Sequence, residues 1–462
     1  MNRNSRSSIL AIPIVIFICL FVSQVQADLT RDVLGDVNND GIVNVLDIVR
    51  VVNIILENNP VPTDYELWAG DVNADEFVNV QDIIVIVSVI MGTMAECPDY
   101  LITCENDLTD CCIQYSSHEI TWEFEVFGDS PGNINTLKDG FIINENDIWI
   151  VGEYYLSPQP NDFLFNMIHW DGNEWNTTPM EPDNNDYGPY YLYSVFGFAP
   201  DDLWTGVGAP VYYNGSTWFE YGHNNSNFPE DLGGIDEMWG VSSEEMYLGM
   251  DSGDIIFWDG DEFSIMETST GTLSQYLDLV EFIDIFGTDS NHMWALSYNI
   301  MQLNEDHPIT LQFYNGFEWV DQYNIDNWEP IEGEISGTIY NAWAYGDTLY
   351  MISGWYGLWK ESITTGEGYY DGSIDDIDPW IYVHGKSLVG NHYNDIFTVS
   401  WQGYYGHWNG VDWYHGTEIR EYFDAMGVSI SCKGLHVKDD IIIAYGDANG
   451  GQFAWVAKGT RN

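Results

Sequence analysis

From about residue 118 onward, short runs of aromatic and β-branched residues alternate with polar turns, a pattern typical of a chain built from many short β-strands. The pattern is clearest from Tyr191 to Gly222, where three tight turns separate four apolar runs. The turns are Ala199-Pro200-Asp201-Asp202, Gly208-Ala209-Pro210 and Asn214-Gly215-Ser216-Thr217. A unit of this size cannot bury its own faces. The pattern therefore predicts a repeat protein whose units pack against one another.

Two markers recur along this part of the chain. The first is a polar turn followed by an apolar strand, and its copies begin at Asn144, Pro200, Ser243, Ser290, Gly346, Tyr393 and Lys438. The second has the form [DN]-G-x-x-[WF], and its clear copies begin at Asp171, Asn214, Asp259, Asn315 and Asn409. Successive copies of the first marker lie 43 to 56 residues apart, the range of four-stranded propeller blades. The repeats predict an all-β, seven-bladed β-propeller.

The ends of the repeat region indicate how such a ring closes. One strand, Ile120 to Phe127, precedes the first repeat, whereas the last repeat ends early at Gly459. Adding the N-terminal strand to the last blade would close the ring without an exposed sheet edge. We therefore expect residues 118–462 to form the propeller.

The second marker is similar to the Asp-box of secreted bacterial propellers, including sialidase-like repeat proteins. It lacks the leading serine of the full Asp-box, so the resemblance implies an architecture more than an activity. We expect each Asp/Asn-Gly pair to form a tight turn and the Trp that follows to pack between blades.

Near the N-terminus, two segments repeat in register: GDVNNDGIVNVLDIVRVVNII from Gly35 and GDVNADEFVNVQDIIVIVSVI from Gly70. Oxygen-bearing side chains recur at loop positions 1, 3, 5, 9 and 12, and position 7 offers a backbone carbonyl, which is how a loop surrounds Ca²⁺. The predicted ligands are Asp36, Asn38, Asp40, Ile42, Asn44 and Asp47 in the first loop, and Asp71, Asn73, Asp75, Phe77, Asn79 and Asp82 in the second. Gly41 provides the sharp turn at position 6 of the first loop, where the second loop has Glu76. The apolar runs 45–56 and 80–91 predict a buried helix after each loop.

The duplicated loop and helix resemble a type I dockerin domain over about residues 34–93. The resemblance implies a small α-helical, EF-hand-like module with two Ca²⁺ sites that docks onto a cohesin-like module of a scaffold or surface protein. Dockerins often have Ser or Thr at loop positions 10 and 11 for cohesin recognition. This chain has Val45-Leu46 and Val80-Gln81 there, so an apolar contact surface is one alternative and a module that only caps its own chain is another.

The first 27 residues have the features of a secretory signal peptide: Arg3 and Arg6, an apolar run, and small residues before Asp28. This predicts a secreted or cell-surface protein, and no later apolar run is long enough to span a bilayer without charges. The chain has 73 acidic and 12 basic residues, a net charge of −61. Such a charge makes nucleic acids and anionic membranes poor partners.

Residues 94–117 lack a sustained period and separate the predicted dockerin-like domain, 28–93, from the propeller. This linker is rich in cysteine, with Cys97, Cys104, Cys111 and Cys112, whereas Cys432 stands alone. In a secreted chain the four are disulfide candidates whose connectivity the sequence does not define. A metal site is the weaker alternative because the spacing lacks a C-x-x-C pair.

Within each predicted blade, the loops between second and third strands and the crossings between blades share one face, and many of them are long. Long loops on a rigid scaffold commonly carry binding sites. The predicted ligand-binding rim consists of Tyr154, Tyr155, Tyr190, Trp328, Trp355, Tyr356, Trp401, Tyr404 and Tyr405. Aromatic platforms beside Asp and Asn suit sugars, although many of these rings could instead pack beneath the loops.

These features favour a secreted, non-catalytic protein that docks through its dockerin-like module and binds carbohydrate, such as a polysaccharide or glycan, or protein on its propeller. A dockerin-borne glycoside hydrolase or lyase acting in polysaccharide catabolism is the alternative, and a purely structural surface protein is a third. Sialidase activity needs an arginine cluster for the substrate carboxylate, whereas this region contains only Arg420 and Arg461. No catalytic residue can be assigned, since so many carboxylates offer no distinctive pair.

Overall fold

The computed structural model divides the chain into two compact units, Met1–Gln114 and Tyr115–Asn462. In the first unit it describes residues 35, 37–38, 45–56, 61–72, 78–80, 82–83 and 86–87. In the second it describes residues 116–128, 133–156, 163–177, 179–182, 190–206, 208–222, 228–229, 232–266, 268, 280–299, 309–325, 339–353, 357–371 and 388–461. The predicted signal peptide and the four disulfide candidates, Cys97, Cys104, Cys111 and Cys112, lie outside the described residues.

The first unit is helical. It contains α2 (Val45–Ile55) and α3 (Asp64–Gly70), and helical residues recur between 80 and 87. Its small core is made of Val37, Val51, Ala69, Val72 and Ile86. The helix expected after the first loop is present, but only one of its faces is buried. The other face, which includes Val45 and Val49, is exposed, so the helix is amphipathic.

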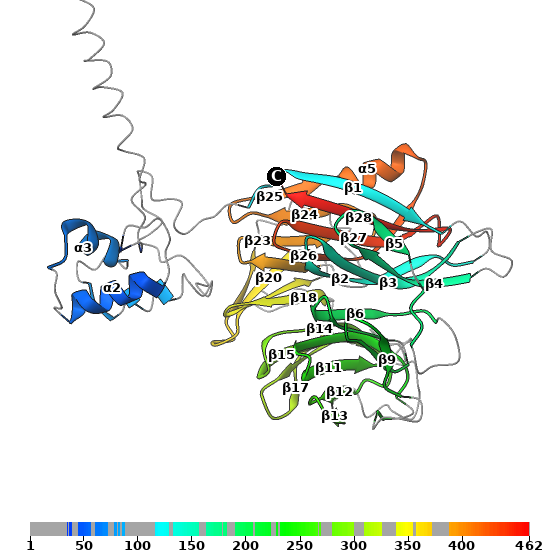
Figure 1. The fold of residues 1–462 in the computed structure, drawn as a ribbon, viewed down its shortest axis with the longest axis horizontal. Helices are drawn as coiled ribbons and strands as arrows, with labels where there is room; N and C mark the ends of the chain where they lie inside the picture. Colours follow the sequence, from blue (N-terminus) through cyan, green and yellow to red (C-terminus); the bar gives the residue numbers. More distant parts are fainter. Residues whose placement is uncertain are drawn as a thin grey trace, which may run out of the picture. The chain divides into compact units, whose positions relative to one another are not determined.

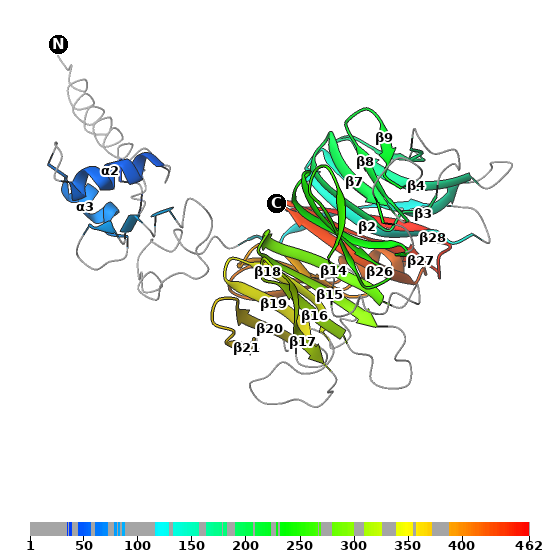
Figure 2. The same ribbon diagram turned by 90° about the horizontal axis from the view of Figure 1, so that it is seen from below.

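The second unit is a seven-bladed β-propeller, as predicted, and each blade is a four-stranded antiparallel sheet (Figures 1 and 2). The first blade contains β2 (Thr136–Asn144), β3 (Asp147–Leu156), β4 (Phe163–Trp170) and β5 (Trp175–Thr177). The second contains β6 (Ser194–Ala199), β7 (Asp202–Gly206), β8 (Pro210–Tyr213) and β9 (Trp218–Glu220). The third contains β10 (Ile235–Ser242), β11 (Glu245–Met250), β12 (Ile255–Trp258) and β13 (Phe263–Met266).

The remaining blades follow the same order. The fourth contains β14 (Val280–Asp289), β15 (His292–Asn299), β16 (Ile309–Tyr314) and β17 (Trp319–Ile325). The fifth contains β18 (Ile339–Tyr345), β19 (Thr348–Ser353), β20 (Gly357–Ser362) and β21 (Gly368–Asp371). The sixth contains β22 (Leu388–His392), β23 (Asp395–Val399), β24 (Tyr405–Trp408) and β25 (Trp413–Gly416). The seventh contains β26 (Ile430–Lys438), β27 (Ile441–Ala448), β28 (Phe453–Arg461) and β1 (Ile120–Phe127).

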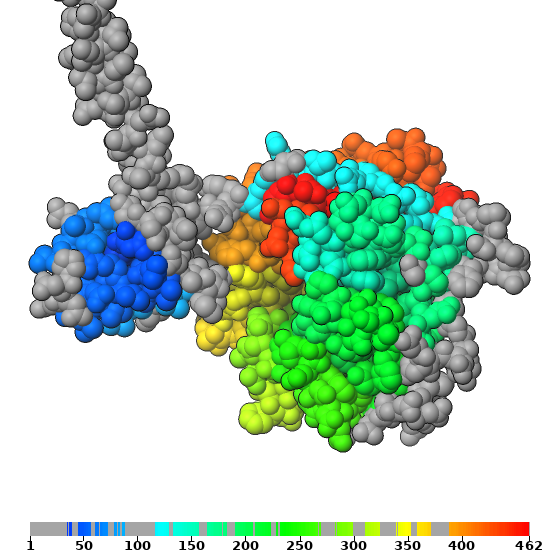
Figure 3. All heavy atoms as spheres, in the orientation of Figure 1, coloured from blue at the N-terminus to red at the C-terminus, as the bar shows by residue number. Residues whose placement is uncertain are grey.

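The ring closes where the N-terminal strand joins the last blade. β1 pairs antiparallel with β28, from Ile120 opposite Arg461 to Phe127 opposite Ala454. In the space-filling view, cyan atoms of β1 lie beside the red C-terminal strand (Figure 3). This confirms the expected closure: β28 would otherwise have a free edge, and β1 supplies its missing hydrogen-bond partners.

The first strand of every blade contacts the first strands of its two neighbours, so these seven strands form the inner ring. Several carry a β-bulge, and polar side chains near the bulges bond to the next blade. Asp139 accepts from the backbone N–H of Val195 at 2.9 Å, and Asp236 from that of Phe282 at 2.9 Å. A bulge redirects a side chain, and here it lets a carboxylate join neighbouring blades.

The apolar core lies between the blades, because each sheet has a neighbour on both faces. Tyr154 and Ile168 of the first blade, for example, share a cluster with Tyr445 and Val456 of the seventh. One further helix, α5 (Glu418–Ala425), lies between the sixth and seventh blades in the sequence, and its Tyr422 stacks on Phe124 of β1 at 3.9 Å between ring centroids. Among the described residues, no helix has the length and apolar character needed to cross a membrane.

Candidate functional sites

Two buried carboxylates mark the predicted calcium loops. Asp47 and Asp82 hold position 12 of the two loops, and both side chains are fully buried. The Asp47 carboxylate accepts a hydrogen bond from the backbone N–H of Asn38 at 3.0 Å, and that of Asp82 accepts from Asn79 at 2.7 Å. A carboxylate is seldom buried without hydrogen bonds or a cation to balance its charge. The two positions thus fit the donor chemistry of a calcium loop.

Most other predicted metal ligands lie outside the described residues, namely Asp36, Asp40, Ile42, Asn44, Asn73, Asp75 and Phe77. Asp71 lies in the described part, where it caps the end of α3 and its backbone N–H bonds to the carbonyl of Leu67 at 3.2 Å. Among the described residues alone, no group of three or more His, Cys, Asp or Glu side chains is placed to hold a metal ion. The two ligand sets therefore stay predictions.

Helix α3 was not expected from the apolar pattern, because it spans less than two turns. A local signal was nevertheless present: Thr63-x-x-Glu66 forms a capping box, in which each side chain bonds to the other residue's backbone N–H. Glu66 also bonds to Nε of Arg50 on α2 at 2.5 Å. The hydrogen bond from Arg50 lowers the pKa of Glu66 to about 2. This ion pair ties α3 to α2.

In the propeller, the structure corrects part of the predicted aromatic rim. Tyr154 and Tyr405 are buried core residues rather than exposed platforms. Tyr154 donates a hydrogen bond to the carbonyl of Met167 at 3.0 Å, and Tyr405 accepts one from Nε1 of Trp122 at 3.2 Å. Burial raises the pKa of both phenols. Both rings lie between blades, where the apolar core needs large side chains.

The other rim residues have different environments. Tyr155 and Tyr190 are half-buried, and Trp328, Trp355 and Tyr356 lie outside the described residues. Trp401 and Tyr404 are exposed at 44% and 36% of their surface. Both belong to the turn between β23 and β24, which is fixed because the carbonyl of Trp401 accepts from the backbone N–H of Cys432 at 2.8 Å. This pair is the exposed aromatic part of the predicted rim.

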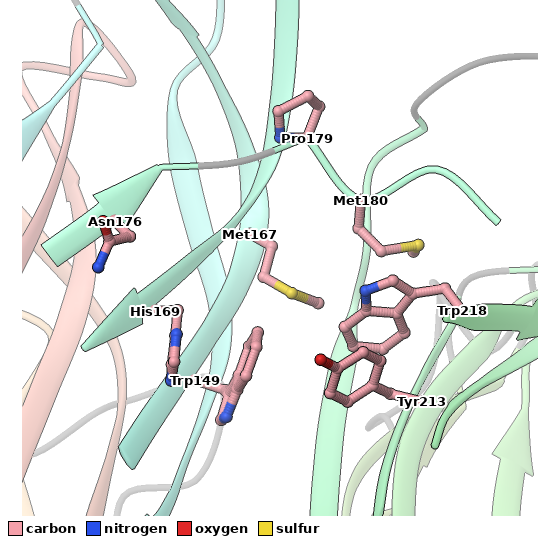
Figure 4. Close-up of a pocket in the computed structure, with 8 residues that line it drawn as sticks. All are labelled: Trp149, Met167, His169, Asn176, Pro179, Met180, Tyr213 and Trp218. Atoms are coloured by element: carbon pink, nitrogen blue, oxygen red, sulfur yellow. The ribbon is translucent and has the colours of Figure 1, made fainter. Parts of the chain in front are cut away.

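A small cavity that sequence reasoning missed lies at the junction of the first two blades (Figure 4). Its volume is about 170 Å³, and its lining residues are Trp149, Met167, His169, Asn176, Pro179, Met180, Tyr213 and Trp218. The lining contains aromatic, thioether, imidazole and amide groups but no carboxylate. No local motif predicts the cavity, because its residues come from β3, β4, β5, β8, β9 and the segment after β5.

His169 packs against Trp149 in the cavity wall and is itself held by Asp147. His169 stacks on Trp149, with 3.8 Å between ring centroids and 15° between planes. Nε2 of His169 lies 2.7 Å from the carboxylate of Asp147. Because an ionised carboxylate only accepts, Nε2 carries a proton in this contact.

The family description "Dockerin type I domain" matches residues 34–91. Residues 34–91 are a type I dockerin domain. Dockerin domains generally bind calcium and dock to cohesin modules.

No curated protein matches this dockerin-bearing chain. Its propeller is similar in fold to several solved structures. YCF48 bound to D1 peptide has a TM-score of 0.48 at 13% identity, over 75% of this chain and 99% of that one. YCF48 from Cyanidioschyzon merolae has a TM-score of 0.46 at 13% identity, over 72% and 98%. The WD40 propeller domain of Doa1 has a TM-score of 0.44 at 10% identity, over 73% and 97%.

The dockerin domain presents apolar side chains to solvent in both of its repeats. Val45, Leu46 and Val49 are more than half exposed on α2, and Val80 and Val87 are exposed in the second repeat. Val45 and Val80 both hold loop position 10. Exposed apolar groups gathered on so small a domain are typical of a contact surface.

Proposed function

We propose that this is a secreted bacterial protein whose dockerin domain binds Ca²⁺ and docks to a cohesin-like module, while its propeller binds a carbohydrate or a protein. The observation that carries the proposal is the type I dockerin domain with its exposed apolar side chains at loop positions 10 and 11. These positions often hold Ser or Thr in dockerins, so here the contact with cohesin would rest on burial of Val45, Leu46 and Val80. Burying such side chains contributes about 25 cal/mol per Å² of apolar surface.

Calcium would be held by the two sets of loop ligands given above. It would bind the oxygens of each loop and so hold the loop against the helix that follows. A cation that binds only the folded form also stabilises that form. Asp47 and Asp82 support this role. Each is buried at the first turn of the helical segment that follows its loop, so each links loop to helix.

The dockerin part of the proposal can be tested with the full-length chain and a panel of purified cohesin modules, by affinity capture with and without a calcium chelator. We expect at least one cohesin to retain the chain, and we expect chelator to release it. Val45→Asp combined with Val80→Asp should reduce capture at least tenfold, because binding would bury two unpaired charges.

Val61→Asp is the matched control, since Val61 is also exposed, at 81%, but precedes α3 and lies outside the loop positions. Its capture should equal that of the unchanged chain. Capture that survives both chelator and the double substitution would overturn the proposed docking surface.

A further inference from the structure

The cavity between the first two blades has an apolar interior and two unpaired polar atoms at one side. In Figure 4 the indole nitrogen of Trp218 and the hydroxyl of Tyr213 point toward the hollow, with Met167 and Trp149 opposite them and Met180 beside Trp218. Within the described part of the chain, neither polar atom has a hydrogen-bond partner. Convergent polar groups in an otherwise apolar pocket are typical of small-molecule sites.

The wall of the cavity is held in place by a buried amide. Asn166 is fully buried, and its side chain bonds to both backbone groups of Met180: the N–H at 2.7 Å and the carbonyl at 3.0 Å. The same amide donates to the carbonyl of Tyr190 at 2.7 Å. These bonds hold Met180 and Tyr190 against the first blade. The cavity wall is therefore pre-organised, which lowers the entropic cost of binding.

The equivalent tryptophan in the fourth blade is buried. There the sequence Tyr314-Asn315-Gly316 through Trp319 repeats the motif that holds Tyr213 and Trp218. Trp319 is only 6% exposed and its indole nitrogen is buried, whereas Trp218 is half-buried and its nitrogen faces the cavity. The two tryptophans thus differ in exposure although they hold the same place in the motif.

The volume of the cavity and the lack of charged residues in its lining limit which ligands it can bind. A cavity of about 150 Å³ holds one six-membered ring, so 170 Å³ admits one ring-sized group. No lining residue is acidic or permanently cationic, and the negative charge of the whole chain disfavours anions. A pyranose is neutral and ring-sized, and it has apolar C–H faces for Met167 and Met180 together with hydroxyls for Trp218 and Tyr213.

We propose that this cavity is a subsite for one pyranose residue of a neutral glycan, with Trp218 donating a hydrogen bond to a ring hydroxyl and Tyr213 exchanging one with its neighbour. This inference rests on the proposed role of the propeller as a binding domain, and it names the ligand class and the residues. The sugar would contact the two methionines, because His169 covers one face of Trp149 and the ring centroids of Tyr213 and Trp218 lie 6.0 Å from that of Trp149.

The test is isothermal calorimetry of the full-length chain with neutral oligosaccharides built from glucose, galactose, mannose or xylose. We expect at least one to bind. Tyr213→Phe and Trp218→Phe should each raise its Kd about fivefold to tenfold, since each removes one hydrogen bond worth roughly 1 kcal/mol. Tyr314→Phe and Trp319→Phe are the matched controls in the fourth blade and should change Kd less than twofold, and thermal melting establishes that all four variants are folded.

Several results would overturn the subsite. If Trp401→Ala abolishes glycan binding and the two cavity variants do not, the sugar binds on the rim, and the proposed function stands without this site. If N-acetyltyrosinamide binds in place of the sugars with the same sensitivity to Tyr213→Phe, the cavity takes an aromatic side chain and the ligand class is wrong. If none of these probes binds, the cavity is not a site for such rings, whereas cohesin capture tests the dockerin domain separately.

Discussion

At the scale of single residues, the recurring [DN]-G-x-x-[WF] marker is explained by one turn geometry. In all five copies the first side chain accepts hydrogen bonds from the backbone N–H groups two and three residues later, at 2.8–3.1 Å. The glycine of each copy has a positive φ, between 84° and 97°. Asp and Asn both supply the required oxygen, and only glycine adopts that backbone angle without strain. The marker is therefore structural.

The glycine requirement gives a residue-scale prediction. Gly215→Ala should lower the free energy of unfolding of the propeller by about 1–3 kcal/mol, because φ is +84° and the new Cβ would lie 2.6 Å from Cβ of Asp201. Gly208→Ala is the control, since a Cβ there meets nothing within 4 Å. Urea unfolding followed by tryptophan fluorescence measures both. Equal midpoints for the two variants would show that the turn geometry is not required.

At the scale of elements, the segment that leads into β1 is attached to the sixth blade by a histidine pair. Nδ1 of His118 lies 2.9 Å from Nδ1 of His407. Nε2 of His407 lies 2.9 Å from the carboxylate of Asp395 and 3.0 Å from the hydroxyl of Ser116. The carboxylate only accepts, so Nε2 of His407 carries a proton, and Nδ1 of a neutral His407 is then a hydrogen-bond acceptor. The contact with His118 is one that a neutral His407 can make.

The surroundings of the pair hold this state. Burial lowers the pKa of His407, and its hydrogen bond to Asp395 offsets this only in part. Burial also opposes ionisation of Asp395, but the hydrogen bond from His407 and the charge of Arg461 outweigh it and keep the pKa of Asp395 below its usual range. Around the pair, Asp412 lies 3.2 Å from Nε2 of His118, whose ring stacks on Tyr414.

This arrangement predicts that acid weakens the attachment of β1. Because the folded chain holds the pKa of His407 below the unfolded value of about 6.5, the unfolded chain binds the extra proton more readily, and stability falls as pH drops below about 6.5. His118→Phe removes the imidazole whose charge also lowers the pKa of His407, while burial, the main cause, remains. We expect the variant to lose slightly less stability than the unchanged chain between about pH 7.5 and 5.5.

Urea unfolding of both chains at several pH values measures this difference. His292→Phe is the control, because the ring of His292 is half exposed and its Nδ1 faces only the carboxylate of Asp289. Parallel acid curves for the unchanged chain and His118→Phe would show that the pair does not couple β1 to pH.

At the scale of the whole molecule, closure of the ring depends on a strand from the other end of the propeller sequence. β1 supplies the fourth strand of the last blade, and its Phe124 packs against Tyr422 and Phe423 of α5. Without it, β28 would be an edge strand with unpaired backbone groups. Such edges recruit other chains.

Two shortened chains test this closure. A chain that starts at Tyr115 keeps β1 and should be a monomer that melts with the propeller of the full-length protein. A chain that starts at Gly128 lacks β1, and we expect it to melt about 5 to 10 °C lower and to associate through β28. Size-exclusion chromatography and calorimetry measure both properties. A stable monomer without β1 would show that three strands suffice in the last blade.

Much of this architecture was predictable because it depends on short-range patterns. The two dockerin loops have local ligand spacing, the turns need Gly at fixed positions, and the strand count implied that Ile120–Phe127 completes the last blade. By contrast, α3 was missed because seven residues show too little periodicity, although Thr63 and Glu66 formed a recognisable cap. In the fifth blade, which lacks the marker, Asp347 accepts hydrogen bonds from Ser362 and Thr364 of the corresponding turn.

The sequence by itself determined the dockerin domain, the seven repeats and the way the ring closes, since each depends on residues near one another in the chain or on a count of strands. Only the tertiary structure decided which aromatic side chains are exposed. Tyr154 and Tyr405 are buried between blades while Trp401 and Tyr404 face solvent, and the alternation of a strand does not distinguish these cases when both of its faces meet a neighbour. The cavity at Trp218 likewise depends on how two blades pack, which no single repeat encodes.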